Sequence, residues 1–255
     1  MFENIIVAVT SPTRNHEIDE TSLKNHLEFL RQNGITSILS GGTTGEFFSL
    51  GKIQRQKLFE LTRKYFDGKI IYNVSDCSVL DVKSNIDFAK NFGADGITLL
   101  PPFFFANAAT DEIIRFFSEA LSYSTLSCML YNFTKHTQNK ITPEILKAVS
   151  HAALKDSDRD ETLIAHTPCY VCGGDSAIFD FYRKGAKGVV SVMANYNPAL
   201  VLKIWQELKV GDFESAEKTQ EEIREISAEF RKPDQIQRIK RAVSKIIKDY
   251  PLTNV

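Results

Sequence analysis

Strong charge imbalance and long apolar runs are both missing from this sequence of 255 residues. Its 31 lysines and arginines nearly balance its 32 aspartates and glutamates, so the formal net charge is −1. A chain with so little net charge has no global field that attracts nucleic acid or an anionic membrane. No run approaches the ~20 apolar residues that span a bilayer, and the apolar segment 5–9 follows no basic segment of the signal-peptide kind. We therefore expect neither nucleic acid nor a membrane among the partners.

Cysteine is scarce as well, with four residues in the whole chain. Cys169 and Cys172 match a CxxC pattern, but they fall in a strand-like run, where positions three apart face opposite sides. No second CxxC and no histidine pair completes a zinc set. The sequence therefore predicts no metal site and reduced thiols, as in a cytoplasmic protein.

Strand-like runs alternate with amphipathic helix-like stretches along the chain. Short strands separated by helical periods are typical of parallel βαβ units, and eight such units in ~250 residues favour a (β/α)8 barrel, the TIM barrel, within the α/β class. The strand-like runs are 5–9, 37–40, 69–74, 96–100, 128–132, 152–155, 169–173 and 188–192. The helix-like stretches include 22–32, 52–66, 79–92, 111–123, 143–150 and 178–184.

The region from Pro198 to Tyr250 is helical in pattern, in three segments broken at Gly211 and Pro233. A barrel needs only one helix after its eighth strand. We therefore predict a barrel over residues 1–209 and a short C-terminal helical extension over residues 210–255, packed on the barrel.

Reactive and hydrogen-bonding side chains gather where the predicted strands end. Active sites of (β/α)8 barrels lie at the carboxyl ends of the strands, so these residues are the candidates for function. They are Thr43 and Thr44 after the second strand, 103–105 (FFF) after the fourth, Tyr131 and Lys155 at the ends of the fifth and sixth, 173–175 (GGD) after the seventh, and 194–195 (AN) after the eighth.

Lys155, at the end of a short apolar run, is the first candidate for catalysis. Burial disfavours the charged form of an amine, and a neutral amine can form an imine with a ketone. Tyr131 ends the preceding strand, and because adjacent strands lie ~5 Å apart, both groups can reach one substrate carbon. The tyrosine hydroxyl can relay the protons that imine formation needs. The alternatives are a surface lysine paired with Asp156 or Asp158 and a core tyrosine, but the two residues together favour catalysis.

Three further segments each allow more than one interpretation. The loop 42–46 (GTTGE) offers flanking glycines, two hydroxyls and backbone amides that can bind a carboxylate of pyruvate size; it lacks the lysine of a phosphate-binding loop, and a plain glycine turn is the alternative. The segment 173–175 can face a polyhydroxy substrate, or Asp175 can cap a helix from 176 onward. The phenylalanines 103–105 need a cover, and we favour a subunit interface over a substrate wall.

Taken together, these segments resemble the dihydrodipicolinate synthase / N-acetylneuraminate lyase family of class I aldolases. They occur in the family's order, and the resemblance runs from residue 5 to residue 211. The segments that carry it are 42–46 (GTTGE), 131–132 (YN), 154–157 (LKDS), 173–175 (GGD), 185–191 (GAKGVVS) and 194–195 (AN).

The resemblance implies a set of roles for this chain. It implies a (β/α)8 barrel with a helical tail, commonly assembled as a homotetramer or a dimer. Lys155 would form the Schiff base, Tyr131 would relay protons, and Thr43 and Thr44 would contact Tyr131 and the carboxylate of pyruvate. Gly42, Gly173 and Asp175 belong to the matching substrate-binding segments, and the backbone carbonyl of Val190 would face the pyruvate. No metal or organic cofactor is implied.

Several positions depart from the family pattern. Thr134 replaces the proline of Tyr-Asn-x-Pro, and His136, beside Lys135, stands where dihydrodipicolinate synthases carry an arginine for the substrate carboxylate. Phe104 stands where those synthases supply a second tyrosine to the neighbouring subunit. Members that accept phosphorylated sugars carry an arginine within 106–108, which is Ala-Asn-Ala here. These departures argue against lysine biosynthesis and for an unphosphorylated substrate.

Three hypotheses follow from the resemblance and its departures. The first is a pyruvate-dependent aldolase that cleaves or forms a 2-keto-3-deoxy sugar acid, similar to 2-keto-3-deoxygluconate aldolases. The second is 4-hydroxy-tetrahydrodipicolinate synthase, with pyruvate and aspartate semialdehyde as substrates and a rearranged carboxylate site using Lys135 or His136. The third is a non-catalytic relative that binds pyruvate. The threonine pair argues mildly against sialic acid lyase, which favours Ser-Thr.

Overall fold

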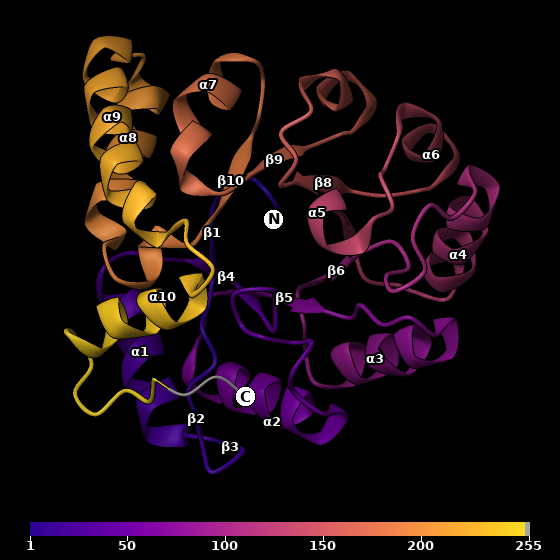
Figure 1. Cartoon of the computed structure of the whole chain (residues 1–255), viewed down its shortest axis with the longest axis horizontal. Coiled ribbons are helices and arrows are strands. Elements are labelled where there is room, and N and C mark those ends of the chain that lie inside the picture. Colours follow the sequence, from indigo (N-terminus) through magenta and orange to yellow (C-terminus); the bar gives the residue numbers. More distant parts are fainter. Residues whose placement is uncertain (253–255) are drawn as a thin grey trace.

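The structure is a computed structural model that describes residues 1–252. Its centre is a closed barrel of eight parallel strands, which confirms the predicted fold (Figure 1). The strands follow the barrel in the order β1-β10-β9-β8-β7-β6-β5-β4. Their bounds are β1 Asn4–Ala8, β4 Ser37–Ser40, β5 Lys69–Asn73, β6 Gly96–Leu99, β7 Cys128–Asn132, β8 Ala153–Asp156, β9 Tyr170–Gly173 and β10 Gly188–Ser191.

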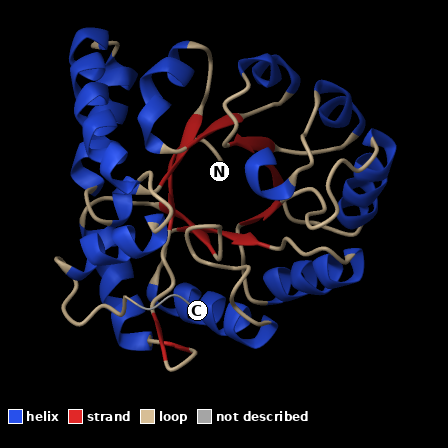
Figure 2. Ribbon diagram, viewed as in Figure 1, coloured by secondary structure: helices blue, strands red, loops and turns tan. Residues whose placement is uncertain are grey.

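Helices cover the outside of the barrel, as Figure 2 shows. Between β8 and β9 a 3-10 helix, η1 (Glu161–His166), takes the place of an α-helix. The outer α-helices are α1 Glu20–Gln32, α2 Lys52–Tyr65, α3 Val79–Asn91, α4 Thr110–Ser122, α6 Pro143–Ala148, α7 Ile178–Arg183 and α8 Pro198–Val210. Smaller elements are β2 Thr13–Arg14, β3 Glu17–Ile18, α5 Thr134–Thr137, η2 Asp175–Ala177 and η3 Met193–Asn195.

Several helix ends lie where their sequence predicts them. The side chain of Thr142 accepts a hydrogen bond from the Ile145 amide, and Pro143 occupies the first turn of α6. Gly211 ends α8 with φ of 79°, a left-handed conformation that glycine adopts without steric cost.

Two apolar clusters lie on opposite sides of the strands. One fills the inside of the barrel and includes Ile6, Met129 and Ala153, while the larger one lies between the strands and the helices. Because side chains alternate along a strand, Cys169 joins the inner cluster and Cys172 the outer one. This confirms that the CxxC pair is split across the strand; all four cysteines are free thiols. Within residues 1–252, no helix is both long and apolar enough to cross a membrane.

The C-terminal extension consists of α9 (Phe213–Phe230) and α10 (Gln235–Ser244). The break between α8 and α9 falls at Gly211 and the break between α9 and α10 falls around Pro233, as predicted. The helix α10 ends before Tyr250. In Figure 1 α9 runs beside α8, and α10 lies at the side of the barrel, where its Val243 belongs to an apolar cluster that packs against Phe29 of α1. The predicted boundary at residue 209/210 stays a prediction, and residues 253–255 of that segment lie outside the described part of the chain.

His26 ties α1 to the carboxyl end of the barrel. Its ring is fully buried, and its Nε2 donates a hydrogen bond to the Asn195 carbonyl at 3.0 Å. Burial lowers the pKa of His26 to about 4, against a partly compensating effect of that hydrogen bond. The folded protein therefore holds His26 neutral where the unfolded chain would protonate it.

We predict that this histidine makes the protein less stable at acidic pH. The stabilisation is fully present above pH 6.5 and is lost as the pH falls towards 4, because the unfolded state binds the proton first. From those two pKa values, the free energy of unfolding falls by about 3 kcal/mol over this range. Urea unfolding of the wild type and of His26→Gln between pH 7 and pH 4.5 measures it. Parallel pH profiles of the two proteins would rule out this role for His26.

Candidate active site

The register between β7 and β8 brings the two main candidates together. Tyr131 pairs directly with Lys155 in the parallel ladder. Each lies two residues after a member of the inner cluster, Met129 or Ala153 respectively, so strand alternation turns both side chains into the barrel. Lys155 is only 5% exposed, and its Nζ lies 3.4 Å from the centroid of the Tyr131 ring. An amine is thus held inside the barrel against an aromatic face.

The hydroxyl of Tyr131 lies between two other hydroxyls. Thr43 Oγ1 is 3.4 Å away and Ser157 Oγ is 3.5 Å away. The Tyr131 ring stacks on Phe133 with 5.8 Å between centroids, which fixes its orientation. Contacts of this length in a site without substrate commonly shorten when substrate binds. The three hydroxyls form a chain that joins the loop after β4 to the segment after β8.

Thr43 and Thr44 belong to a turn anchored by buried polar contacts. The Gly41 carbonyl accepts from Asn73 Nδ2 at 2.8 Å, and the Gly45 carbonyl accepts from Ser11 Oγ at 2.7 Å. At the end of the turn, Glu46 forms an ion pair with Lys240 of α10, and both side chains are buried. The C-terminal helix therefore supports the loop that carries the two threonines.

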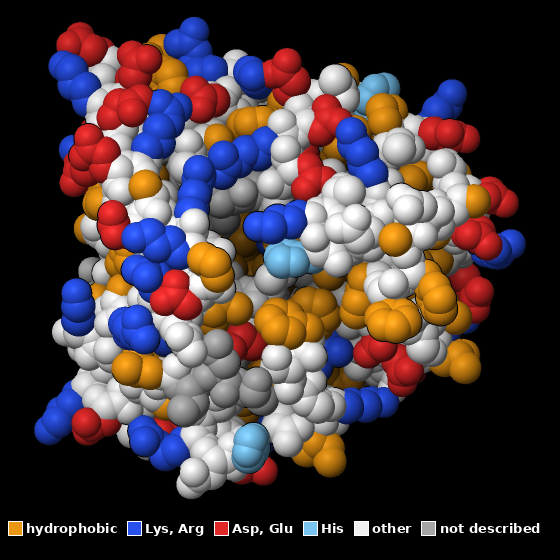
Figure 3. Space-filling view, in the orientation of Figure 1, with side chains coloured by type: hydrophobic (Ala, Val, Ile, Leu, Met, Phe, Trp, Pro, Cys, Tyr) orange, Lys and Arg blue, Asp and Glu red, His pale blue; other side chains and the backbone are white. Residues whose placement is uncertain are grey.

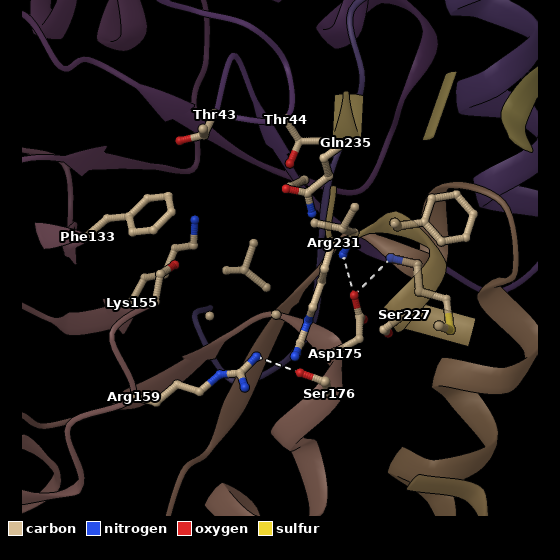
Figure 4. A pocket seen from close by; sticks show the side chains of 18 of the residues that line it. Thr43, Thr44, Phe133, Lys155, Arg159, Asp175, Ser176, Ser227, Arg231 and Gln235 are labelled. Atoms are coloured by element: carbon tan, nitrogen blue, oxygen red, sulfur yellow. Dashed lines mark hydrogen bonds between the residues drawn. The ribbon is translucent and has the colours of Figure 1, made fainter. Parts of the chain in front are cut away.

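A cavity opens at the carboxyl ends of the strands, inside the ring of helices. Figure 3 shows the hollow on this face, and Figure 4 shows the side chains around it. Of the predicted site residues, the structure brings these to its wall: Thr43, Thr44, Tyr131, His136, Lys155, Gly173, Asp175 and Val190.

Two predicted residues do not reach this cavity. Gly42 is buried within the turn after β4, where an added Cβ would lie 3.1 Å from the Leu39 side chain. Phe104 is 87% exposed, with φ of 89°, and Phe105 beside it is also exposed. Phe103 instead lines a neighbouring apolar pocket together with Phe47. In the single chain, Phe104 therefore takes no part in the site.

Asp175 lines the cavity, and its carboxylate is bound by donors of the turn after β10. Its carboxylate accepts hydrogen bonds from the Val192 and Met193 amides, each at 2.9 Å, and from the Ser191 hydroxyl. Burial raises the pKa of Asp175, while those donors act against the shift. Its oxygens thus hold the turn after β10 in place and do not cap a helix from 176 onward.

The backbone near Asp175 is also hydrogen-bonded within the protein. The Val190 carbonyl accepts a hydrogen bond from the Gly174 amide at 3.1 Å, with Gly174 at φ of 103°. An added Cβ on Gly173 would lie 2.6 Å from the Asp156 carbonyl oxygen, so glycine permits the close approach of β9 to β8. The glycine pair shapes the wall of the cavity.

Among the cavity-lining residues that the sequence analysis did not select are Ser157, Arg159, Arg231 and Gln235. Ser157 and Arg159 follow Lys155 closely in the sequence, and this proximity could have identified them as site residues. Arg231 and Gln235 come from the C-terminal extension, and only the tertiary fold brings them here. Within residues 1–252, no His, Cys, Asp and Glu side chains gather in a group suited to a metal ion.

Comparison with known proteins adds to this geometry. The model of the dihydrodipicolinate synthetase family matches residues 1–247. The chain belongs to this family. Its members are carbon–carbon lyases of the aldolase type, so this chain is an enzyme of that class.

Individual relatives of the chain carry related names. It is 27% identical over 228 residues to 4-hydroxy-tetrahydrodipicolinate synthase of Methanococcus maripaludis, covering 84% of this chain and 78% of the relative. The Staphylococcus epidermidis enzyme of the same name is 29% identical over 214 residues, covering 78% and 72%.

Solved structures confirm the fold. The Escherichia coli K12 prophage protein YagE, in complex with pyruvate, superposes with a TM-score of 0.93 at 20% identity and covers 100% of this chain and 92% of its own. KD(P)GA from T. tenax has a TM-score of 0.89 at 21% identity, covering 98% and 89%.

We predict that Lys240→Met destabilises the protein by about 3–5 kcal/mol, because the buried carboxylate of Glu46 loses its charge partner. The double variant Glu46→Gln/Lys240→Met should lose less, since neither charge remains. Guanidinium unfolding measures both. The matched control is Lys83→Met, which breaks the more exposed pair with Glu119 and should cost less than about 1 kcal/mol. Equal losses for the two lysines would contradict the prediction.

Proposed function

We propose that this chain is a pyruvate-dependent class I aldolase that forms a Schiff base on Lys155. The substrate class we propose is a 2-keto-3-deoxy sugar acid, cleaved reversibly to pyruvate and an aldehyde. One observation carries the proposal: the buried amine of Lys155 lies against the Tyr131 ring at the wall of an open cavity. A primary amine held in that way inside a barrel can add to a ketone and needs no metal or organic cofactor to do so.

The proposed reaction is an imine cycle at Lys155. The Lys155 amine adds to the ketone carbon of pyruvate, and the ketone oxygen takes a proton to give a carbinolamine. Loss of water gives the imine, and loss of a proton from the adjacent carbon gives an enamine. That carbon bonds to the aldehyde carbon, the aldehyde oxygen takes a proton, and water releases the product from Lys155.

Tyr131 and the two threonines are placed to move these protons. The Tyr131 hydroxyl has Thr43 on one side and Ser157 on the other. Thr44 lines the same cavity from the turn after β4, where backbone amides can also receive the pyruvate carboxylate. Cleavage of a keto acid runs the same steps in reverse.

The names of the relatives favour 4-hydroxy-tetrahydrodipicolinate synthase as the second candidate function. His136 does line the cavity, packed edge-on against Phe133 at 4.3 Å, and burial and the charge of Lys135 lower its pKa. A neutral imidazole is a poor substitute for a bidentate arginine. Turnover with aspartate semialdehyde distinguishes this candidate, and pyruvate binding without any aldol turnover would indicate the non-catalytic relative. The homo-oligomer and the cytoplasmic location stay predictions.

We predict that borohydride reduction in the presence of pyruvate attaches pyruvate covalently to Lys155. Intact-mass and peptide mass spectrometry would locate the adduct. Lys155→Arg keeps a long basic side chain but has no imine-forming amine, so it should show neither adduct nor turnover. Lys218→Arg, on the exposed face of α9, is the control and should behave as wild type. A folded wild-type protein without an adduct on Lys155 would refute the proposed function.

We also predict that Tyr131→Phe forms the adduct slowly and turns over ~10²–10⁴-fold more slowly, because the ring stays but the proton relay is lost. The phenylalanine ring can keep the stack on Phe133, so KM for pyruvate should change little. Steady-state kinetics in the condensation direction, with pyruvate varied at a fixed aldehyde concentration, measure kcat and KM separately. Tyr123→Phe, an exposed tyrosine after α4, is the matched control. Unchanged kcat in Tyr131→Phe would show that another group moves the proton.

A further inference from the structure

Arg159 adopts an unusual backbone conformation at the edge of the cavity. It lies four residues after Lys155 and has φ of 61°, in the left-handed region that side chains other than glycine rarely adopt. Strain of this kind persists only where the surroundings hold it, and it concentrates at functional sites. The conformation sends the side chain over the cavity, where Nη2 donates to Ser176 Oγ at 2.7 Å. Its Nε is buried and has no hydrogen-bond partner within residues 1–252.

Arg231 reaches the same cavity from the opposite direction, from the end of α9. Figure 4 shows the two guanidinium groups extending towards each other beside Ser176. Burial and the charge of Arg159 lower the pKa of Arg231, against an opposing effect of the Asp175 charge, as expected for two guanidinium groups placed as in Figure 4. The fold thus holds two like charges together in a partly closed space.

The nearby carboxylates are occupied by other groups. Asp158 accepts from the Thr134 amide and hydroxyl, and Asp160 pairs with Lys140 at 2.8 Å. Asp175 binds the turn after β10. Over residues 1–252, neither arginine forms an ion pair with a carboxylate within 4 Å of it. Figure 3 shows several basic side chains around the hollow.

We propose that Arg159 and Arg231 bind an anionic group, a carboxylate or a phosphate, on the aldehyde-derived half of the substrate. This inference rests on the proposed function, which places pyruvate at Lys155. A guanidinium pair matches the bidentate geometry of either anion. The anion would relieve the repulsion between the two arginines and fill the donor capacity of Arg159 Nε. These arginines come from the segments after β8 and α9, so they supply charge that the segment 106–108 after β6 lacks.

The test compares acceptor aldehydes with and without an anionic group. Glyceraldehyde 3-phosphate is paired with glyceraldehyde, and succinic semialdehyde is paired with butanal. We expect the wild type to prefer one or both anionic members in kcat/KM. Arg159→Gln and Arg231→Gln should each lower kcat/KM for the preferred anionic aldehyde ~10–100-fold, the usual effect of losing a charged hydrogen bond. Their kcat/KM for the neutral partner should fall much less. The pair that shows the preference identifies phosphate or carboxylate.

Two further variants keep the result interpretable. Arg159→Gly removes the guanidinium while relieving the left-handed strain, so it should fold at least as well as the wild type and show the same loss. Arg115→Gln, an exposed arginine on α4, is the control for removing one positive charge. Equal kcat/KM for anionic and neutral aldehydes in the wild type, or equal losses for both in the variants, would overturn the inference.

Binding and trapping separate this inference from the proposed function. Pyruvate should still be trapped on Lys155 in both arginine variants. Titration of succinate and of inorganic phosphate against the wild type and Arg159→Gln/Arg231→Gln needs no turnover. Binding that disappears in the double variant supports the anion site even if Lys155 forms no adduct, and equal binding by both proteins, or none by the wild type, overturns it.

Discussion

The pairing of Tyr131 with Lys155 across β7 and β8 is the constraint on which the site depends. In a parallel ladder a shift of one residue would turn a side chain to the opposite face of the strand. The apolar neighbours Met129 and Ala153, fixed in the inner cluster, prevent such a shift. Packing inside the barrel thus sets which way the amine points, and closure of the barrel supplies the aromatic face and the hydroxyls around it.

The C-terminal extension completes what the barrel begins. The buried pair of Glu46 and Lys240 links α10 to the turn that carries Thr43 and Thr44, while Arg231 enters the cavity from the end of α9. The barrel supplies the amine and the hydroxyls, and the extension supports the substrate loop and adds charge to the outer part of the cavity. The outer part of the cavity is therefore built by both parts of the chain, with Arg159 from the barrel and Arg231 from the extension.

The sequence predicted the barrel well, because the patterns of strands and helices are local. Lys155 and Tyr131 were selected because they end predicted strands, and the register of β7 and β8 brings them together. The pattern could not show that Asp175 would bind the Val192 and Met193 amides, since that contact joins two loops. Nor does any pattern show the left-handed φ of Arg159, a backbone state set by the surrounding fold. The residues that were missed depend on tertiary contacts.

The departures from the family pattern and the arginine pair have a common physical meaning. His136, held close to neutral by burial and by Lys135, cannot act as the cation that dihydrodipicolinate synthases use for the acceptor carboxylate. Phe104 offers no hydroxyl and, in this chain, points to solvent. Positive charge is nevertheless present in the same cavity, on Arg159 and Arg231. An acceptor bound by these arginines would be oriented by other contacts than those that an arginine at position 136 would make, without any change at Lys155.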